Sequence, residues 1–467
     1  MSGRGIYLGL LLLVWGQAVQ ADQDSDLDLI PSATPAPVTA APAAAASPDR
    51  RVYLENATTQ VAATQDPAVP LPAPPGYTWQ ERLLLDIRQD YPIGQRSRLF
   101  LSDRFNLRDE DDLPFPSHED IVTDFREAYI SWRPSDQLYV DAGRINLKSG
   151  IALGYNPTDF FKTRSVTEPL SQDPSAQRED RLGTVMLRGQ RIWGGGSLTF
   201  AYAPELHRPS AIYSNSNLPS FNPMFDRTNA DDRWLIKGSV DFGGNSSPEF
   251  LLYREAGTTH FGTNLSMGLG QSAVAYLEWS GAERPDLITT AVDYGRETGT
   301  LPAGAAPPIP TATHDTFKSE LALGLSYTTE ADITFNVEYL LNQAGFSRTD
   351  WDDWFAAGVR AGPQSPLLDE LWYLRRYAQD QQQQNTRQAY FTRADWVDAF
   401  DVKLELTAFA LVDAYDHSGI AQLSADYYVS DTWTLGAQAV KYFGSRRSDF
   451  GSLGTSYSLL FSVAHYF

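Results

Sequence analysis

The last eleven residues of the chain place an apolar or aromatic side chain at every second position back from the terminal Phe467. His465 is the one polar residue in this series. A period of two is typical of a β-strand that shows one face to an apolar medium. Such a strand could close a barrel in a lipid bilayer, or it could lie at the edge of a soluble β-sandwich.

The first 21 residues have the order of regions that is typical of a signal peptide. Arg4 supplies a positive charge, the apolar run over 6–15 is too short to span a bilayer, and small residues lead to a cleavage site after Ala21. An uncleaved membrane anchor is the alternative, but the four aspartates over 22–28 favour export. We therefore expect removal of this peptide, so that any further membrane is crossed by strands.

The composition fits an exported barrel. The chain has no cysteine and so needs no disulfide framework. Aromatic residues make up 12% of the sequence, which suits two girdles at the membrane interfaces. The formal net charge of −21 argues against nucleic acid as a partner.

Residues 22–78 are rich in proline and alanine, and such a low-complexity segment cannot bury a core. We expect a disordered periplasmic segment there, acting either as a plain spacer or as a tether to a periplasmic partner. The barrel is then expected to occupy residues 79–467.

The barrel region shows repeated alternation of apolar and polar residues, clearest over 402–408. It predicts strands at 81–89, 96–107, 121–133, 137–147, 181–192, 196–203, 232–242, 248–256, 259–268, 271–281, 317–328, 331–341, 387–397, 401–412, 418–429, 432–443 and 454–467.

The connections between these strands alternate in length from the third strand onward. Short periplasmic turns with long external loops are typical of an outer-membrane barrel, and a soluble sandwich would not sort its loops in this way. Both ends should be periplasmic, so the strand number must be even. We therefore expect an all-β, single-chain, antiparallel transmembrane barrel of 16 or 18 strands, which can leave an aqueous channel.

The segment Gly143–Phe161 carries the most distinctive motif of the chain, with Gly143-Arg144, Gly150 and Asn156-Pro157-Thr-Asp159 in order. It resembles an element of porin-like Gram-negative outer-membrane β-barrels of unknown substrate. The resemblance implies an outer-membrane location, contact with lipid and lipopolysaccharide, and a terminal Phe467 that the barrel-assembly machinery reads as an assembly signal. Asn156-Pro157 with Asp159 is also a turn initiator, which could fold its loop inward as a constriction or form a plain external turn.

If the apolar face of each strand meets lipid, the opposite face lines the lumen. The lumenal charges are then basic on the N-terminal wall and acidic on the C-terminal wall, with Lys403 as the exception. They could set a transverse field across a pore, or they could pair and brace a closed barrel. The predicted pore-lining residues are Arg82, Arg88, Arg96, Arg98, Arg104, Arg144, Lys148, Asp159, Lys162, Arg164, Arg188, Glu278, Glu320, Glu338, Lys403, Glu405 and Asp426.

Residues 366–379 predict a short helix that begins at Pro366, in a long external loop that also holds Trp351 and Trp354. These aromatic residues could form a platform for sugar rings or apolar solutes. They could equally pack the loop on itself.

The sequence gives little support for an enzyme, and an outer-membrane hydrolase with serine and histidine on adjacent strands is a third alternative. None of the six histidines lies in a Gly-x-Ser-x-Gly setting or in a metal-ligand spacing, and no glycine-rich phosphate loop is present. We expect no cofactor and no metal. The expected function is passive diffusion of small polar or anionic solutes. The alternative is a barrel without a channel that serves as a surface scaffold, adhesin or export partner. The solute and the oligomeric state stay open.

Overall fold

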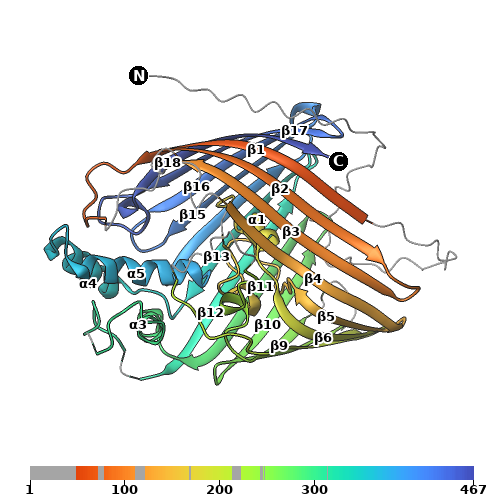
Figure 1. Cartoon of the computed structure of the whole chain (residues 1–467), viewed down its shortest axis with the longest axis horizontal. Coiled ribbons are helices and arrows are strands. Elements are labelled where there is room, and N and C mark those ends of the chain that lie inside the picture. The colour runs from red at the N-terminus through yellow and green to blue at the C-terminus, as the bar shows by residue number, and fades with distance from the viewer. Residues whose placement is uncertain are drawn as a thin grey trace.

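The structure is a computed structural model, and it describes residues 49–71, 78–110, 121–167, 170–212, 222–241, 246, 248–304, 306–312 and 314–467. The predicted signal peptide lies outside these residues. The described chain forms one closed sheet of 18 antiparallel strands, which confirms the expected barrel and its even strand number (Figure 1).

The strands follow one another around the barrel in sequence order. Their bounds are β1 (Asp49–Ala63), β2 (Trp79–Pro92), β3 (Ser97–Glu110), β4 (Ile121–Ser135), β5 (Leu138–Ile145), β6 (Thr184–Trp193), β7 (Gly196–Ala203), β8 (Arg233–Val240), β9 (Glu249–Glu255), β10 (Thr258–Leu269), β11 (Ala273–Arg284), β12 (Thr316–Thr328), β13 (Ile333–Asn342), β14 (Gln388–Trp396), β15 (Leu404–Asp413), β16 (Gly419–Ser430), β17 (Trp433–Phe443) and β18 (Thr455–Tyr466).

Strand β1 closes the ring, because it pairs with β18 on one side and with β2 on the other. The backbone N–H of Phe467 donates to the carbonyl of Val52 at 2.9 Å, so the terminal aromatic residue is held at this seam. Each of the 17 predicted strands corresponds to one of β2–β18.

The expected disordered segment over 22–78 is wrong for residues 49–63, and the barrel begins before residue 79. The outward face of β1 carries Asn56, Thr58 and Gln60, so its alternation of apolar and polar residues is weak. Asn56 and Thr58 instead donate to the Glu81 carboxylate on β2, both at 2.6 Å. β1 is stabilised by its pairing with β18 and β2, and the local sequence pattern gives no sign of that pairing.

The outer wall is apolar and the inner wall is polar. On β18, Phe461 is 63% exposed, whereas Ala464 on the opposite face is 6% exposed. This arrangement is the one expected of a wall that meets lipid. Among the described residues, no helix is both long enough and apolar enough to cross a membrane.

Short turns gather at one end of the barrel and most long connections at the other, where the β9–β10 and β15–β16 connections are exceptions. The connections hold η2 (Phe160–Lys162), α1 (Pro174–Asp180), α2 (Phe225–Thr228), α3 (Leu287–Glu297), α4 (Arg348–Arg360), α5 (Pro366–Asp380), η3 (Ala399–Asp401) and η4 (Phe450–Ser452).

Helices α3, α4 and α5 pack together at the long-loop end, forming what we call the cap (Figure 1). Trp351 and Trp354 are 1% and 0% exposed within it, and Val69 from the β1–β2 connection joins the same cluster. The aromatic residues of α4 therefore pack the loops on one another and do not form an open platform.

Candidate functional site

The connection between β5 and β6, residues 146–183, folds into the barrel, and we call it the inner loop. Figure 1 shows its helix α1 inside the ring of strands. Leu147, Phe160 and Phe161 pack against inward residues of β6, β8 and β9, which ties the start of the loop to that wall. The Asn-Pro turn of the sequence motif thus belongs to a loop that enters the lumen.

Two wall carboxylates hold the inner loop by its backbone. Glu278 on β11 accepts hydrogen bonds from the N–H groups of Ile151 and Ala152. Glu338 on β13 accepts from those of Leu153 and Gly154, at 2.7 and 2.9 Å. Both glutamates are fully buried. Hydrogen bonds to a charged acceptor are stronger than neutral ones, so these two residues anchor four successive peptide groups.

Two glycines of the motif permit this close approach. Gly150 has a φ of +83°, and a Cβ placed there would lie 2.3 Å from a carboxylate oxygen of Glu278. A Cβ at Gly154 would lie 2.4 Å from the ring of Phe391. The spacing of glycines in the motif is therefore explained by contact between the loop backbone and the wall.

A buried ion cluster holds the loop in shape. Asp159 accepts from two nitrogens of Arg181 at 2.8 and 3.0 Å and lies 3.4 Å from Arg178. Burial opposes ionisation of Asp159, but Arg181 and Arg178 outweigh burial and hold the pKa of Asp159 below its usual value.

Lys162 lies in the same cluster, and no carboxylate of the described residues is in direct contact with it. Its Nζ donates to the carbonyl of Asn156 at 2.6 Å and lies 3.9 Å from the centre of the Tyr155 ring. Burial lowers the pKa of Lys162 from 10.5 to about 8, although Glu320, Asp159 and Glu278 favour the charged form.

The end of α1 is bound to the wall of β2, β3 and β4. Asp180 lies 2.7 Å from Arg104 and 3.4 Å from Arg126, and both arginines also contact Asp86. Arg104 and Asp86 are 2% and 0% exposed, so this network is enclosed. The loop therefore reaches the N-terminal wall as well as the walls that hold its start.

The start of α1 is bound to the C-terminal wall. Arg393 on β14 contacts Asp173 at 3.1 Å, and Gln422 and Gln438 on β16 and β17 donate to Ser171. The inner loop is thus held on opposite sides of the barrel.

The inner loop is also tied to the cap. Arg164 of the inner loop contacts Asp380 at the end of α5 at 3.1 Å, and Arg227 of α2 contacts both Asp380, at 2.7 Å, and the carbonyl of Arg164. Arg144 donates to the carbonyl of Gly183 at 2.9 Å, so it joins the two ends of the loop.

The structure separates the predicted pore-lining residues into two groups. Those that are buried in fixed contacts are Arg82, Arg104, Arg144, Asp159, Lys162, Arg164, Glu278, Glu320 and Glu338. Those with partly or fully exposed side chains are Arg88, Arg96, Arg98, Lys148, Arg188, Lys403, Glu405 and Asp426.

Most charged side chains of the exposed group form ion pairs or hydrogen bonds with residues near them. Arg98 contacts Asp90, Arg188 contacts Asp141, Lys148 contacts Glu179 and Lys403 contacts Asp431. Arg96 donates to the carbonyl of Pro134, and Glu405 accepts from Tyr428. The structure brings Asp159, Lys162, Glu278, Glu320 and Glu338 into one region, because the inner loop lies against β11–β13.

Sequence reasoning missed the residues that fix the inner loop to the walls, among them Asp86, Arg126, Arg178, Asp180, Arg181 and Arg393. One signal was present, because Asp173-Pro174 begins a charge-dense helix whose N-cap is Asp173. Within the described residues, no group of three or more metal-ligating side chains is placed to hold a metal ion.

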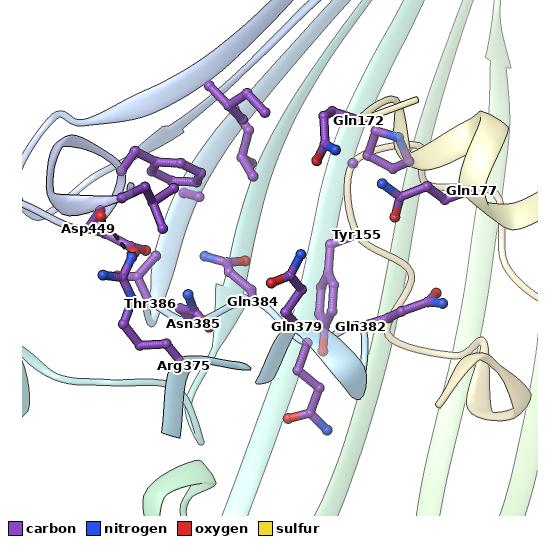
Figure 2. Close-up of a pocket in the computed structure, with 18 of the residues that line it drawn as sticks. Tyr155, Gln172, Gln177, Arg375, Gln379, Gln382, Gln384, Asn385, Thr386 and Asp449 are labelled. Atoms are coloured by element: carbon purple, nitrogen blue, oxygen red, sulfur yellow. Dashed lines mark hydrogen bonds and ion pairs between the residues drawn. The ribbon is translucent and has the colours of Figure 1, made fainter. Parts of the chain in front are cut away.

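A cavity of about 700 Å³ lies between α5, the inner loop and the inner wall of the later strands (Figure 2). Gln172 and Gln177 approach it from the inner loop, and Gln379, Gln382 and Gln384 approach from α5 and the residues that follow it. Phe409 and Tyr442 line it from the wall.

No protein-family pattern and no curated protein sequence matches the chain. Solved structures do match. Pseudomonas aeruginosa OccK5 (OpdH) is 7% identical, with a TM-score of 0.50 over 90% of this chain and 97% of that one. Acinetobacter baumannii OccAB1 is 9% identical, with a TM-score of 0.50 over 90% of this chain and 96% of that one. Salmonella typhi OmpF in complex with daunomycin is 8% identical, with a TM-score of 0.42 over 90% of this chain and 97% of that one. The chain therefore has an 18-stranded β-barrel fold similar to that of the outer-membrane porins.

Proposed function

We propose that this chain is an outer-membrane channel for passive diffusion of small polar or anionic solutes, and that the inner loop forms its constriction. The observation that carries the proposal is the polar inner loop held within the lumen by Glu278 and Glu338. The lumen of an 18-stranded barrel is too wide for the inward side chains of its own strands to fill. A loop folded inside narrows that lumen and lines it with charge.

The rest of the proposal concerns how the chain reaches its membrane. Export by the segment 1–21 and insertion by the barrel-assembly machinery, with Phe467 as part of its signal, would place the short turns in the periplasm. The outward apolar wall would meet lipid, and the long loops would meet lipopolysaccharide. In this account the chain needs no cofactor and catalyses no reaction.

An exposed lumenal cation, Arg88, supports a preference for anions. Arg88 on β2 is exposed and acts electrostatically on Glu179 of α1, so it lies on the lumenal side beside the inner loop. A cation next to a constriction raises the local concentration of anions even when the whole protein is acidic.

A barrel without a channel, acting as a surface scaffold, adhesin or export partner, is the second candidate. The observation that favours it is that the inner loop contacts opposite walls and the cap at once. Such a loop would block the lumen if no continuous water path passes it.

Planar-bilayer recordings of the purified full-length protein distinguish the two functions. We expect discrete conductance steps after insertion of single proteins. Proteins that insert, as shown by heat-modifiable migration in electrophoresis, but conduct no current at any voltage would overturn the channel and leave the second candidate. Size-exclusion chromatography with light scattering would give the oligomeric state in the same preparation.

A further inference from the structure

The cavity under the cap has the size and the position of a binding site. Its volume of about 700 Å³ lies within the range of small-molecule sites in proteins. It is bounded by the inner loop, by α5 and by strands β13–β18, so a solute that enters past the cap meets it before the constriction.

Primary amides dominate the polar side of this cavity. An amide donates and accepts hydrogen bonds within one group, and a hydroxyl group does the same, so the two are complementary. The glutamines that line the cavity are Gln172, Gln177, Gln379, Gln382, Gln383 and Gln384.

Part of this hydrogen-bonding capacity is not used by the fold. The amide nitrogen and oxygen of Gln384 and the amide oxygen of Gln383 have no partner among the described residues. The backbone carbonyl of Gln384 accepts a hydrogen bond from the side chain of Asn342 at 3.1 Å, which fixes Gln384 at the cavity, while its buried amide makes no hydrogen bond within the described residues.

The charged side chains that line the cavity are compensated by their own neighbours. Asp159 is paired with Arg181 and Arg178, Arg375 is paired with Asp449 at 2.6 Å, and Lys162 donates to a backbone carbonyl. Arg376 also has an interaction within the structure. Among the described residues, both carboxylates of the lining are thus paired with arginines, and Lys162 is held by a backbone carbonyl and by the ring of Tyr155. The neutral amides are then the main polar groups left for a solute, which favours a neutral one.

The opposite side of the cavity is apolar and partly aromatic, with Phe409, Tyr442 and Phe450 among its residues. Sugar rings combine an apolar C–H face, which packs on aromatic rings, with an edge of hydroxyl groups. We propose that this cavity binds a neutral mono- or disaccharide, with the ring face toward the β15–β17 wall and the hydroxyls toward the glutamines. The proposal deepens the proposed function by naming a class of solute.

Calorimetric titration of the full-length barrel with maltose tests this assignment. The protein is held in a detergent without a sugar headgroup, because a maltoside detergent would compete for the site. We expect saturable binding of maltose and no binding of 1,6-hexanediol, which has hydroxyls but no ring. Absence of saturable maltose binding, or binding of glucuronate alone, would overturn the assignment.

Two single substitutions locate the site. We expect Gln384→Ala and Gln379→Ala each to weaken maltose binding by about fivefold, the usual effect of losing one neutral hydrogen bond. Gln379 is exposed on α5, so its replacement places no demand on folding. The control is Gln137→Ala, an exposed glutamine in the β4–β5 turn at the other end of the barrel. Equal maltose affinity in all three variants would place any binding elsewhere and overturn the proposal.

Calorimetric titration does not depend on ion conduction, so the binding site and the proposed channel can be rejected independently of each other. Maltose binding to a barrel that conducts no current would reject the channel and leave the site. Conducting barrels that bind no maltose would reject the site and leave the channel.

Discussion

Glu338 and Leu153 meet inside the barrel, where a carboxylate oxygen of Glu338 accepts a hydrogen bond of 2.7 Å from the Leu153 backbone N–H. The two residues come from β13 and from the inner loop, so this contact links a rigid wall to the segment that crosses the lumen. Glu278 on β11 makes the equivalent contact with Ala152. The position of the inner loop, the proposed constriction, therefore depends on two buried carboxylates.

Glu338→Gln should loosen the inner loop and raise single-channel conductance. The substitution removes the negative charge that accepts two backbone N–H groups, and each such bond contributes about 1.5–3 kcal/mol. Bilayer recordings measure the change. Glu330→Gln, at an exposed position in the β12–β13 turn, is the matched control. Identical conductance and gating noise in the two variants would mean that the anchor does not position the constriction.

Asp159→Asn should destabilise the inner loop strongly. It leaves the buried guanidinium groups of Arg181 and Arg178 without their shared carboxylate, a change that typically costs about 3–5 kcal/mol. Thermal unfolding followed by circular dichroism measures the loss. Adding Arg181→Met to Asp159→Asn should recover part of it, and a double variant no more stable than the single one would argue against this pairing.

The strand pattern of this barrel could be predicted from the sequence because lipid imposes a simple rule on it. One face of each strand must be apolar, and that rule holds from β2 to β18. It fails at β1, where the outward Asn56 and Thr58 are satisfied by Glu81 of the neighbouring strand. The register of a strand depends on which strand it pairs with, so the local sequence of β1 could not show that Glu81 would satisfy these side chains.

The charges in the lumen could be assigned to a face, but their partners could not be predicted. Glu278 and Glu338 do face inward, yet they bind loop backbone and not a facing basic wall. Arg104 instead meets Asp180 from the inner loop. Which groups meet depends on the path of that loop, and its turn residues indicate a bend without giving its direction.

The inner loop should become more stable as pH rises from about 8 toward 10.5. In the folded protein the pKa of Lys162 is lowered to about 8, whereas an unfolded loop restores its ordinary value of 10.5. The unfolded state therefore binds more protons within this window, so stability increases with pH there. Below about pH 8 both states carry the proton, and the cost of burying the charge is fully present.

Thermal unfolding of the wild type and of Lys162→Met across this window measures the effect. The variant lacks the titrating amine and should show a flatter profile than the wild type. Parallel profiles would mean that other groups, such as nearby tyrosines, cause the pH dependence.

Arg88→Glu should reduce or reverse anion preference at low salt. In a KCl gradient, the reversal potential of the wild type should lie on the chloride side of zero. That of the variant should shift toward the equilibrium potential of potassium. In molar salt the Debye length falls to about 3 Å, so the two proteins should become alike. Asp332→Asn, an exposed change in the β12–β13 turn, is the control for charge at the mouth. A wild-type pore that prefers cations, unchanged by Arg88→Glu, would place the filter elsewhere.

Removal of residues 49–63 should prevent closure of the barrel. β1 is hydrogen-bonded to β18 through Tyr53↔Tyr466 and its neighbours, and to β2 along most of its length. Its loss leaves two unpaired strand edges in lipid, where each unsatisfied backbone group costs several kcal/mol. The deletion should therefore yield protein that does not show heat-modifiable migration after assembly into membranes. Gln60→Val keeps the strand and should assemble as the wild type does. A deleted chain that still gives a heat-modifiable barrel would mean that β18 and β2 can pair directly, and that β1 is dispensable for closure.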